Sequence, residues 1–297
     1  MKNLIIIILV IIVIGLGMYL LIQNSSDNDV NLTKDNGIAT STIETKQEDK
    51  SRTIIGASVE KREIIAYHFG TGNTELLFVG GIHGGYSWNT ALIAYELMDY
   101  LEKASSTIPA NVRVTIIPVL NPDGLAKVTA STTARFSPPD ISLDSALLTA
   151  ARFNGRNVDL NRNFDCDWQS SGTWQNKAVS GGSEVFSEPE SRAIKNYVET
   201  NKLAAVVVFY SAAGGVYASN CHNSISAETR ALTKTYADAS GYKDYEDFDF
   251  YEITGDMVNW LAKNNIPAIS VLLSNHKDTE WTKNKAGIDA LIKYYAN

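Results

Sequence analysis

Residues 152–165 read Arg-Phe-Asn-Gly-Arg-Asn-Val-Asp-Leu-Asn-Arg-Asn-Phe-Asp, in which three arginines and four asparagines surround a Val-x-Leu strand signal. Guanidinium groups bind carboxylates and phosphates through forked pairs of hydrogen bonds, so this composition suits recognition of an anion. A polar loop whose side chains tie down neighbouring backbone would have the same composition. Taken alone, the stretch leaves both interpretations open.

On either side of this stretch, apolar runs typical of buried strands alternate with helical patterns. The strand-like runs are Leu76–Gly81, Val112–Leu120, Ala204–Phe209 and Ala268–Leu273, and the helical patterns are Trp88–Leu101, Glu188–Glu199, Ser226–Ala239, Gly255–Asn264 and Lys285–Tyr295. This alternation predicts the α/β class, with a central mixed, mostly parallel sheet between helical layers. We expect functional groups in the loops beyond the carboxyl ends of the strands.

Composition limits the possible partners. The 297 residues are 44% hydrophobic and 20% charged, as in an ordinary globular protein with a substantial core. Since 26 basic residues face 33 acidic ones, the net charge is −7 and nucleic acid is not an expected partner. With two cysteines, a structural zinc site built from several thiolates is excluded by count.

The N-terminus predicts a membrane anchor. Residues 4–22 carry no charge, and 19 residues of helix span about 28 Å, close to the thickness of a bilayer's hydrocarbon core. We therefore expect a transmembrane signal-anchor over residues 1–22, with a cleaved signal peptide as the alternative. Only Lys2 and the terminal amine precede the run, so the rest of the chain is predicted to be extracytoplasmic, or secreted if cleavage occurs.

Two further segments follow the apolar run. Residues 23–52 are polar, mixed in charge and without hydrophobic periodicity, which predicts a flexible extracytoplasmic linker. Residues 53–297 have the length of a single large α/β domain.

Four more motifs accompany residues 152–165. A glycine-rich loop, Gly80-Gly81-Ile82-His83-Gly84, follows a predicted strand, and its histidine by itself is a weak signal. The others are Asn121-Pro122-Asp123-Gly124, Phe186-Ser187-Glu188-Pro189-Glu190 and the segment from Tyr251 to Trp260. In this order, over nearly all of residues 53–297, the motifs resemble the zinc metallocarboxypeptidases related to carboxypeptidase A. The resemblance implies a three-layer α/β/α sandwich and a zinc site that removes C-terminal amino acids from peptides.

In that family, two histidines and a glutamate hold zinc, and a second glutamate is the general base that activates a water molecule. The first histidine matches His83. The glutamate ligand falls on Ser87, or on Tyr86 by a different count, the second histidine on Tyr210, and the general base on Leu272. Serine and tyrosine hydroxyls are poor zinc ligands, and leucine cannot accept a proton. We therefore expect zinc, the cofactor that the resemblance implies, to be absent or weakly bound.

The substrate-binding half of the resemblance is complete. Asn161 and Arg162 match the pair that binds the terminal carboxylate of the peptide. Arg152 is the candidate for the arginine that stabilises the oxyanion, and Arg156 is the alternative.

Tyr251 matches a mobile tyrosine that closes over the bound terminal residue, although a surface aromatic residue is the alternative interpretation. Val258 falls where the family sets its side-chain preference. An apolar pocket floor is expected there, which favours an aliphatic or aromatic terminal residue.

The two cysteines, Cys166 and Cys221, lie in segments that should border the cleft, so a disulfide is expected in an oxidising compartment. A metal site rebuilt from His83, His222 or His276 with thiolates is the less favoured alternative.

Together these residues predict a membrane-anchored, carboxypeptidase-like domain that is catalytically impaired or inactive and binds peptide or protein C-termini, cell-wall peptides among them. One alternative is an active zinc carboxypeptidase with non-standard metal ligands. The other is a structural scaffold without a ligand.

Overall fold

The structure, a computed structural model, describes residues 51–129, 135–222 and 224–296. The predicted anchor, residues 1–22, and nearly all of the predicted linker, residues 23–52, lie outside the described residues. Among the residues described, no helix is both long and apolar enough to cross a bilayer. The first strand begins at Arg52, beside the predicted domain boundary.

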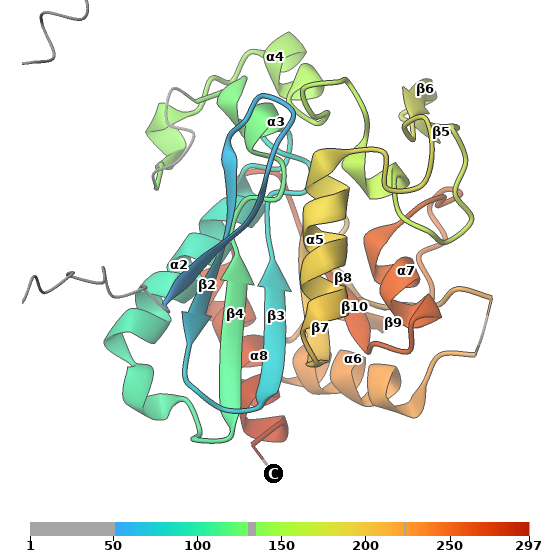
Figure 1. Cartoon of the computed structure of the whole chain (residues 1–297). Helices are drawn as coiled ribbons and strands as arrows, with labels where there is room; N and C mark the ends of the chain where they lie inside the picture. Colours follow the sequence, from blue (N-terminus) through green and yellow to red (C-terminus); the bar gives the residue numbers. More distant parts are fainter. Residues whose placement is uncertain (1–50, 130–134, 223, 297) are drawn as a thin grey trace, which may run out of the picture. The chain divides into compact units, whose positions relative to one another are not determined.

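A mixed sheet organises the domain. Within the described ranges its eight strands run in the order β1-β2-β4-β3-β7-β10-β8-β9 (Figure 1). The strands are β1 (Arg52–Ala57), β2 (Glu63–Phe69), β3 (Thr74–Val79), β4 (Val112–Ile117), β7 (Leu203–Ser211), β8 (Gly215–Ala218), β9 (Asp244–Tyr245) and β10 (Ala268–Leu273). The four neighbouring strands β4, β3, β7 and β10 are parallel, whereas the β1–β2, β2–β4 and β10–β8 pairs are antiparallel. The mixed sheet that the sequence predicts is confirmed.

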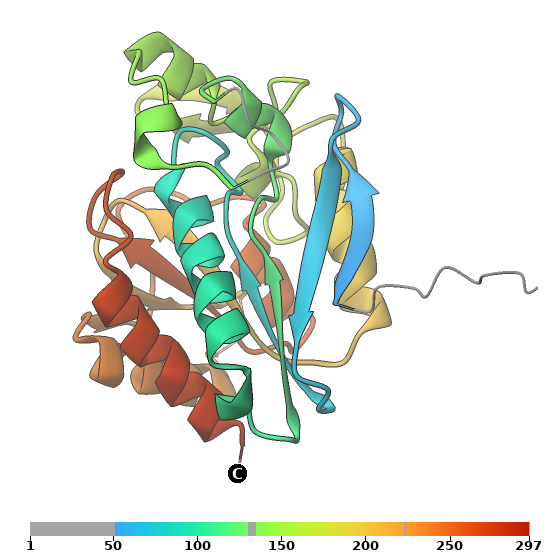
Figure 2. The same cartoon turned by 90° about the vertical axis from the view of Figure 1, so that its left-hand side faces the viewer.

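Helices cover both faces of this sheet, and Figures 1 and 2 show them on its two sides. On one face lie α2 (Asn89–Lys103), α6 (Ala227–Ser240) and α8 (Trp281–Tyr294), and on the other α5 (Pro189–Thr200) and α7 (Met257–Lys263). Alternate strand residues feed the two cores: Val207 packs toward the first set of helices and Val208 toward the second. This is the three-layer α/β/α sandwich expected from the sequence.

Shorter elements lie in the loops between the main strands and helices. They are α3 (Pro122–Ala126), α4 (Ser145–Ala150), the 3₁₀ turns η1 (Ser105–Thr107), η2 (Pro138–Asp140) and η3 (Leu160–Arg162), and the antiparallel hairpin of β5 (Ser171–Trp174) with β6 (Lys177–Ser180). The sequence stretch 152–165 passes through η3 and not through a strand. Asp159 caps this turn, since its Oδ1 accepts the Asn161 backbone N–H at 3.2 Å.

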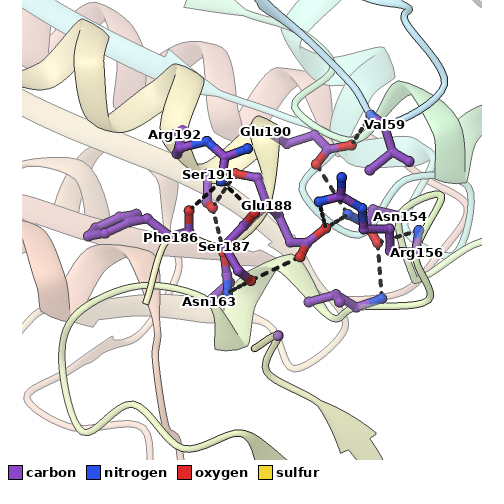
Figure 3. Close-up of polar contacts among 12 residues, drawn as sticks. Val59, Asn154, Arg156, Asn163, Phe186, Ser187, Glu188, Glu190, Ser191 and Arg192 are labelled. Atoms are coloured by element: carbon purple, nitrogen blue, oxygen red, sulfur yellow. Dashed lines mark hydrogen bonds and ion pairs between the residues drawn. The ribbon is translucent and has the colours of Figure 1, made fainter. Parts of the chain in front are cut away.

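Asn163 fixes this stretch to its neighbours. Its Nδ2 donates to the carbonyl oxygens of Gly181 and Glu184, and its Oδ1 accepts the Glu188 backbone N–H at 3.1 Å. Gly181 and Glu184 lie in the loop before α5, and Glu188 caps the helix; Figure 3 shows Asn163 beside Glu188. A single buried side chain therefore holds the loop that carries Asn161 against the helix.

A buried carboxylate pair fixes the other end of the stretch. Asn154 Nδ2 donates to Glu188 Oε2 at 2.8 Å and to Glu190 Oε2 at 3.1 Å, as Figure 3 shows. Glu188 also accepts from the Ser187 hydroxyl at 2.9 Å. The Ser-Glu-Pro-Glu motif is thus a structural support, and it positions Arg152, two residues before Asn154.

Candidate functional site

A cavity of about 790 Å³ lies beyond the carboxyl ends of β7 and β10. It brings together residues that are far apart in the sequence. Of the predicted site residues, its wall includes His83, Arg152, Asn161, Tyr210, Tyr251, Val258 and Leu272. Ser87, Arg156 and Arg162 are not among its lining residues.

His83 follows β3 and is 5% exposed. Neither of its ring nitrogens has a hydrogen-bond partner among the described residues. Asp159 Oδ1 lies 3.7 Å from Nε2, beyond hydrogen-bond range. Burial, together with the positive charges of Arg152 and Arg162, lowers the pKa of His83 well below its usual value, so the imidazole is neutral at pH 7.

Tyr210 and Leu272 occupy the predicted positions of the second histidine and the general base. They are register partners on β7 and β10, and both belong to the core between the sheet and α7. The Tyr210 ring lies 5.7 Å from the ring of His83, and its hydroxyl donates to Asn161 Oδ1 at 3.0 Å. Burial raises the pKa of Tyr210 well above its usual value, so this hydroxyl stays protonated.

Ser87, the predicted position of the glutamate ligand, is buried beside the cavity wall. Its hydroxyl has no hydrogen-bond partner in the described part of the chain.

The residues around His83 do not fit a zinc site of the kind that the resemblance implies. Such a site needs three protein ligands with lone pairs directed at one point. Residues 51–129, 135–222 and 224–296 contain no group of three or more His, Cys, Asp or Glu side chains that could hold a metal ion. Beside His83, Tyr210 is a protonated hydroxyl that is already hydrogen-bonded, and Asp159 is bound to Arg152.

The cysteine sulfurs are joined in a disulfide, Cys166–Cys221, with a Cα–Cα distance of 6.1 Å. It links the segment after η3 to the segment after β8. Because both sulfurs are in the disulfide, neither is available as a thiolate ligand for a metal site with His83, His222 or His276. His222 pairs with Asp167 at 2.5 Å instead.

Arg152 is buried in the cavity wall. Its Nε donates to Asp159 Oδ2 at 2.8 Å, and its guanidinium carbon lies 4.5 Å from the centre of the Trp174 ring. Within the described residues, the guanidinium is ion-paired with Asp159 and hydrogen-bonds through Nε, and no hydrogen bond involves its two Nη groups. Arg156, the alternative candidate, has a 54% exposed side chain and lies 3.6 Å from Glu188 Oε2.

The side chain of Asn161 is hydrogen-bonded within the chain through both its oxygen and its nitrogen. Its Oδ1 accepts from the Tyr210 hydroxyl and from the Met257 backbone N–H, and its Nδ2 donates to Asp256 Oδ2 at 2.9 Å. It therefore joins η3 to β7 and to the first turn of α7.

Arg162 lies behind the cavity wall. Its Nη1 donates to the Glu252 carbonyl at 3.3 Å and its Nη2 to the Thr173 carbonyl at 3.1 Å. The Tyr251 ring centre is 5.6 Å from its guanidinium carbon. The structure thus places Arg162 as a support of two cavity loops, not as a group that faces the cavity.

Tyr251 and Val258 both line the cavity, but they differ in exposure. Tyr251 is 47% exposed and packs on Phe248 with ring centres 4.9 Å apart. Val258 is buried in the first turn of α7.

Other lining residues carry no motif that the sequence could reveal. They include Trp174, Tyr217, Asn220 and Ser270, whereas Tyr86 and His276, which also line the cavity, are alternatives named from the sequence. Tyr217 enters the wall because β8 pairs antiparallel with β10, which places it opposite Ser270. Only this strand pairing, not a spacing in the sequence, could have identified it.

Comparison with known proteins identifies the family. The family model for zinc carboxypeptidase matches residues 39–293. A zinc carboxypeptidase of Simulium vittatum is 31% identical over 154 residues, which cover 50% of this chain and 48% of that protein. The chain spans about half the length of the curated relatives it matches.

Two solved structures share the fold at low sequence identity. Carboxypeptidase A of Helicoverpa armigera superposes with a TM-score of 0.64 at 17% identity, over 82% of this chain and 68% of that one. The murein-tripeptide amidase MpaA of Escherichia coli O157 gives 0.57 at 17% identity, over 83% and 92%. From the family match over most of its length, the chain belongs to the zinc carboxypeptidase family.

Proposed function

We propose that this domain binds the C-terminal ends of peptides in the cavity and does not cleave them. The proposal rests on two residues of the cavity wall, Arg152 and Leu272. Arg152 hydrogen-bonds within the described residues through Nε and not through its two Nη groups, whereas Leu272 lines the cavity at the position that the resemblance assigns to the general base. A fork of two N–H groups matches a carboxylate, and a leucine side chain cannot activate water.

Asp159 gives Arg152 its orientation. Because the Nε bond to Asp159 fixes the guanidinium plane, the Nη groups are held ready for a ligand and lose little entropy when it binds. Arg162, which the sequence favours for this role, is bound to backbone carbonyl oxygens. In the proposed complex Arg152 therefore binds the carboxylate, and Arg162 and Asn161 keep the surrounding loops in place. Tyr251, at the exposed edge, covers the bound residue.

The proposal extends to the setting of the domain. The disulfide Cys166–Cys221 favours an oxidising compartment. With the apolar run at residues 4–22, this supports a domain tethered outside the cytoplasm. Stem peptides of a cell wall are a ligand class with free C-termini in that location, and a murein-tripeptide amidase is among the proteins of the same fold.

The binding test compares acetylated tripeptides that differ only at the C-terminus. Calorimetry on the full chain should show the free acid binding at least about tenfold more tightly than the amide, since the amide lacks the charge that Arg152 pairs with. Arg152→Lys keeps a positive charge beside Asp159 but removes the forked pair of N–H donors. It should weaken binding of the free-acid peptide by about tenfold. Arg156→Lys is the matched control outside the cavity. It should change neither the dissociation constant of the acid nor that of the amide. Equal binding of acid and amide, or no binding of either, favours the scaffold and contradicts the proposal.

The cleavage test uses the same peptides with added zinc. Chromatography should detect no released terminal residue over many hours. Efficient release that a chelator abolishes would instead establish the alternative, an active zinc carboxypeptidase with non-standard ligands.

A further inference from the structure

Two adjacent aromatic side chains are exposed where the loop after β9 borders the cavity. Phe250 is 60% exposed and Tyr251 is 47% exposed, and both are lining residues. Phe248 packs on both, with its ring centre 5.1 Å from that of Phe250 and 4.9 Å from that of Tyr251. It also lies 5.5 Å from the ring of Tyr217, which fixes the group to β8. We call Phe248, Phe250 and Tyr251 the rim patch. An exposed aromatic surface that is held in place beside a cavity indicates a contact surface.

The segment that carries the rim patch is strongly acidic. Residues 244–252 contain five Asp and Glu residues and no Lys, Arg or His. Three exposed carboxylates of this segment have no ion-pair partner within the described residues: Asp247, Asp249 and Glu252. Asp247 and Glu252 are also lining residues of the cavity. Because carboxylates are ionised at pH 7, negative charge surrounds the rim patch.

The positive charge of the cavity is buried. Among the described lining residues, Arg152 is the only lysine or arginine, and it is 3% exposed. Burial and the charge of Arg152 lower the pKa of both lining histidines, His83 and His276, so they are neutral at pH 7. Gln175 and Asn176, the lining residues of the turn between β5 and β6, carry no charge. The cavity wall is therefore positive at a buried point and negative at its exposed edge.

A peptide with a terminal carboxylate and a cationic side chain earlier in its sequence matches this arrangement of charge. A guanidinium group can stack on an aromatic ring and pair with a carboxylate, so arginine suits the rim patch especially well. An acidic segment would be repelled by Asp247 and Glu252. We propose that the rim patch and these two carboxylates bind basic residues that precede the C-terminal residue of the ligand. The inference rests on the proposed function, because Arg152 must hold the terminal carboxylate.

The test compares three tetrapeptide free acids on the full chain: acetyl-Arg-Arg-Ala-Leu, its citrulline analogue, which keeps the shape of arginine without the charge, and acetyl-Glu-Glu-Ala-Leu. The terminal leucine is common to all three. Calorimetry at low salt should show the arginine peptide binding about tenfold more tightly than the citrulline peptide, and the glutamate peptide more weakly than either. In about 0.5 M sodium chloride the ratio of arginine to citrulline affinity should fall to about threefold or less, because exposed charges are screened.

Two variants of the acidic segment test the residues. Asp247→Asn/Glu252→Gln should reduce the ratio of arginine to citrulline affinity to about threefold or less and leave the citrulline constant within about twofold. Phe250→Leu keeps an apolar side chain but removes the aromatic ring, and it should reduce the ratio by about two- to threefold. The control, Glu199→Gln/Asp238→Asn, removes the same number of charges from exposed positions on α5 and α6. It should leave the ratio unchanged.

The outcomes separate the two proposals. If the citrulline peptide binds as tightly as the arginine peptide in the unaltered chain while acids still exceed amides, the inference is wrong and the proposed function stands. If the preference for arginine survives in Asp247→Asn/Glu252→Gln, or falls equally in the control variant, the rim does not cause it and the inference is overturned. Loss of the discrimination between acid and amide would remove both proposals. The comparison of peptides in the unaltered chain does not depend on whether a variant folds.

Discussion

Asp159 and His83 lie 3.7 Å apart, yet they belong to loops whose buried polar groups are in opposite states. In residues 152–163, Asp159 is bonded to Arg152 and to a backbone N–H, and Asn163 donates and accepts several hydrogen bonds. In the loop over residues 80–88, both ring nitrogens of His83 and the Ser87 hydroxyl have no hydrogen-bond partner among the described residues.

Buried polar groups with hydrogen-bond partners stabilise the fold, whereas buried polar groups without partners lower its free energy of unfolding. A metal-bound histidine usually donates its second ring N–H to a carboxylate. Asp159 is the carboxylate beside His83, but it is bonded to Arg152 instead. In residues 152–163, Asp159 and Asn163 therefore have their hydrogen-bond partners within the chain. His83, in the other loop, has no hydrogen-bond partner among the described residues. Substitutions in the two loops should accordingly have opposite consequences.

The largest effect is expected for Asp159→Ala. The substitution leaves Arg152 as a buried, unpaired charge and removes the cap of η3, so the free energy of unfolding should fall by about 3–5 kcal/mol. Urea unfolding at pH 7 measures it. Asp165→Ala is the control, because Asp165 pairs with Lys263 at a half-exposed site and should cost less than about 1 kcal/mol. Similar losses for the two variants would contradict the role of Asp159 as the support of Arg152 and η3.

Removal of the disulfide tests the covalent support of the same region. Cys166 and Cys221 are 55 residues apart in the sequence. Closing a loop of that length stabilises the folded state by about 4 kcal/mol in the chain-entropy model, and removal of a native disulfide typically costs about 2–5 kcal/mol. The double variant Cys166→Ala/Cys221→Ala should lower the urea midpoint but leave binding of the acid peptide within about threefold. If peptide binding were lost in variant protein that is still folded, the disulfide would belong to the site.

Much of this fold follows from the sequence, and the reason is visible in particular elements. Buried strands such as β10 are continuous apolar runs, and its bounds match the predicted Ala268–Leu273. Helix α7 begins at Met257, two residues later than predicted, because Gly255 has a φ of +63° and Asp256 caps the helix. Strands β8 and β9 have only four and two residues, too few for a periodic pattern.

The cavity was only partly predictable. The sequence motif identifies Arg152 and Asn161 because both lie in one short, continuous stretch of the chain. The sequence does not show that the Arg162 guanidinium is bound by the Thr173 and Glu252 carbonyl oxygens, since backbone acceptors carry no residue signature. For the same reason, the place of Tyr217 depends on a strand pairing that no motif records.

A moderate, pH-dependent effect is expected at Glu280. Although burial opposes its ionisation, hydrogen bonds from Lys283, the Ser274 backbone N–H and the Tyr242 hydroxyl lower the pKa of Glu280 to about 2. A depressed carboxyl pKa stabilises the folded state above the unfolded value near 4.3, and that contribution disappears as the pH falls toward 2. The Glu280→Gln variant should therefore be less stable at pH 7 by about 1 kcal/mol.

The gap between the Glu280→Gln variant and the unaltered chain should narrow between about pH 5 and pH 2.5, which urea midpoints at several pH values will follow. A gap that stays constant with pH would show that the lost packing, not the charge, causes the difference. Glu280 holds Ser274 in the loop between β10 and α8, which contains the cavity residue His276. This test therefore extends the comparison of partnered and unpartnered groups to a third segment.

The smallest effect, and the sharpest comparison, comes from one substitution made in both regions. Ser87 and Ser191 are both buried, but only the Ser191 hydroxyl is bonded, to Asn163 Oδ1 at 2.5 Å and to the Glu188 carbonyl at 2.9 Å. Ser191→Ala should lower the free energy of unfolding by about 1–2 kcal/mol, whereas Ser87→Ala should leave it unchanged or raise it by up to about 1 kcal/mol. The substitution removes the same atom in both places, so the difference isolates the presence of a partner. If Ser87→Ala destabilised the chain as much as Ser191→Ala does, the Ser87 hydroxyl would have a hydrogen-bond partner in solution. The contrast between the loop around His83 and residues 152–163 would then be wrong.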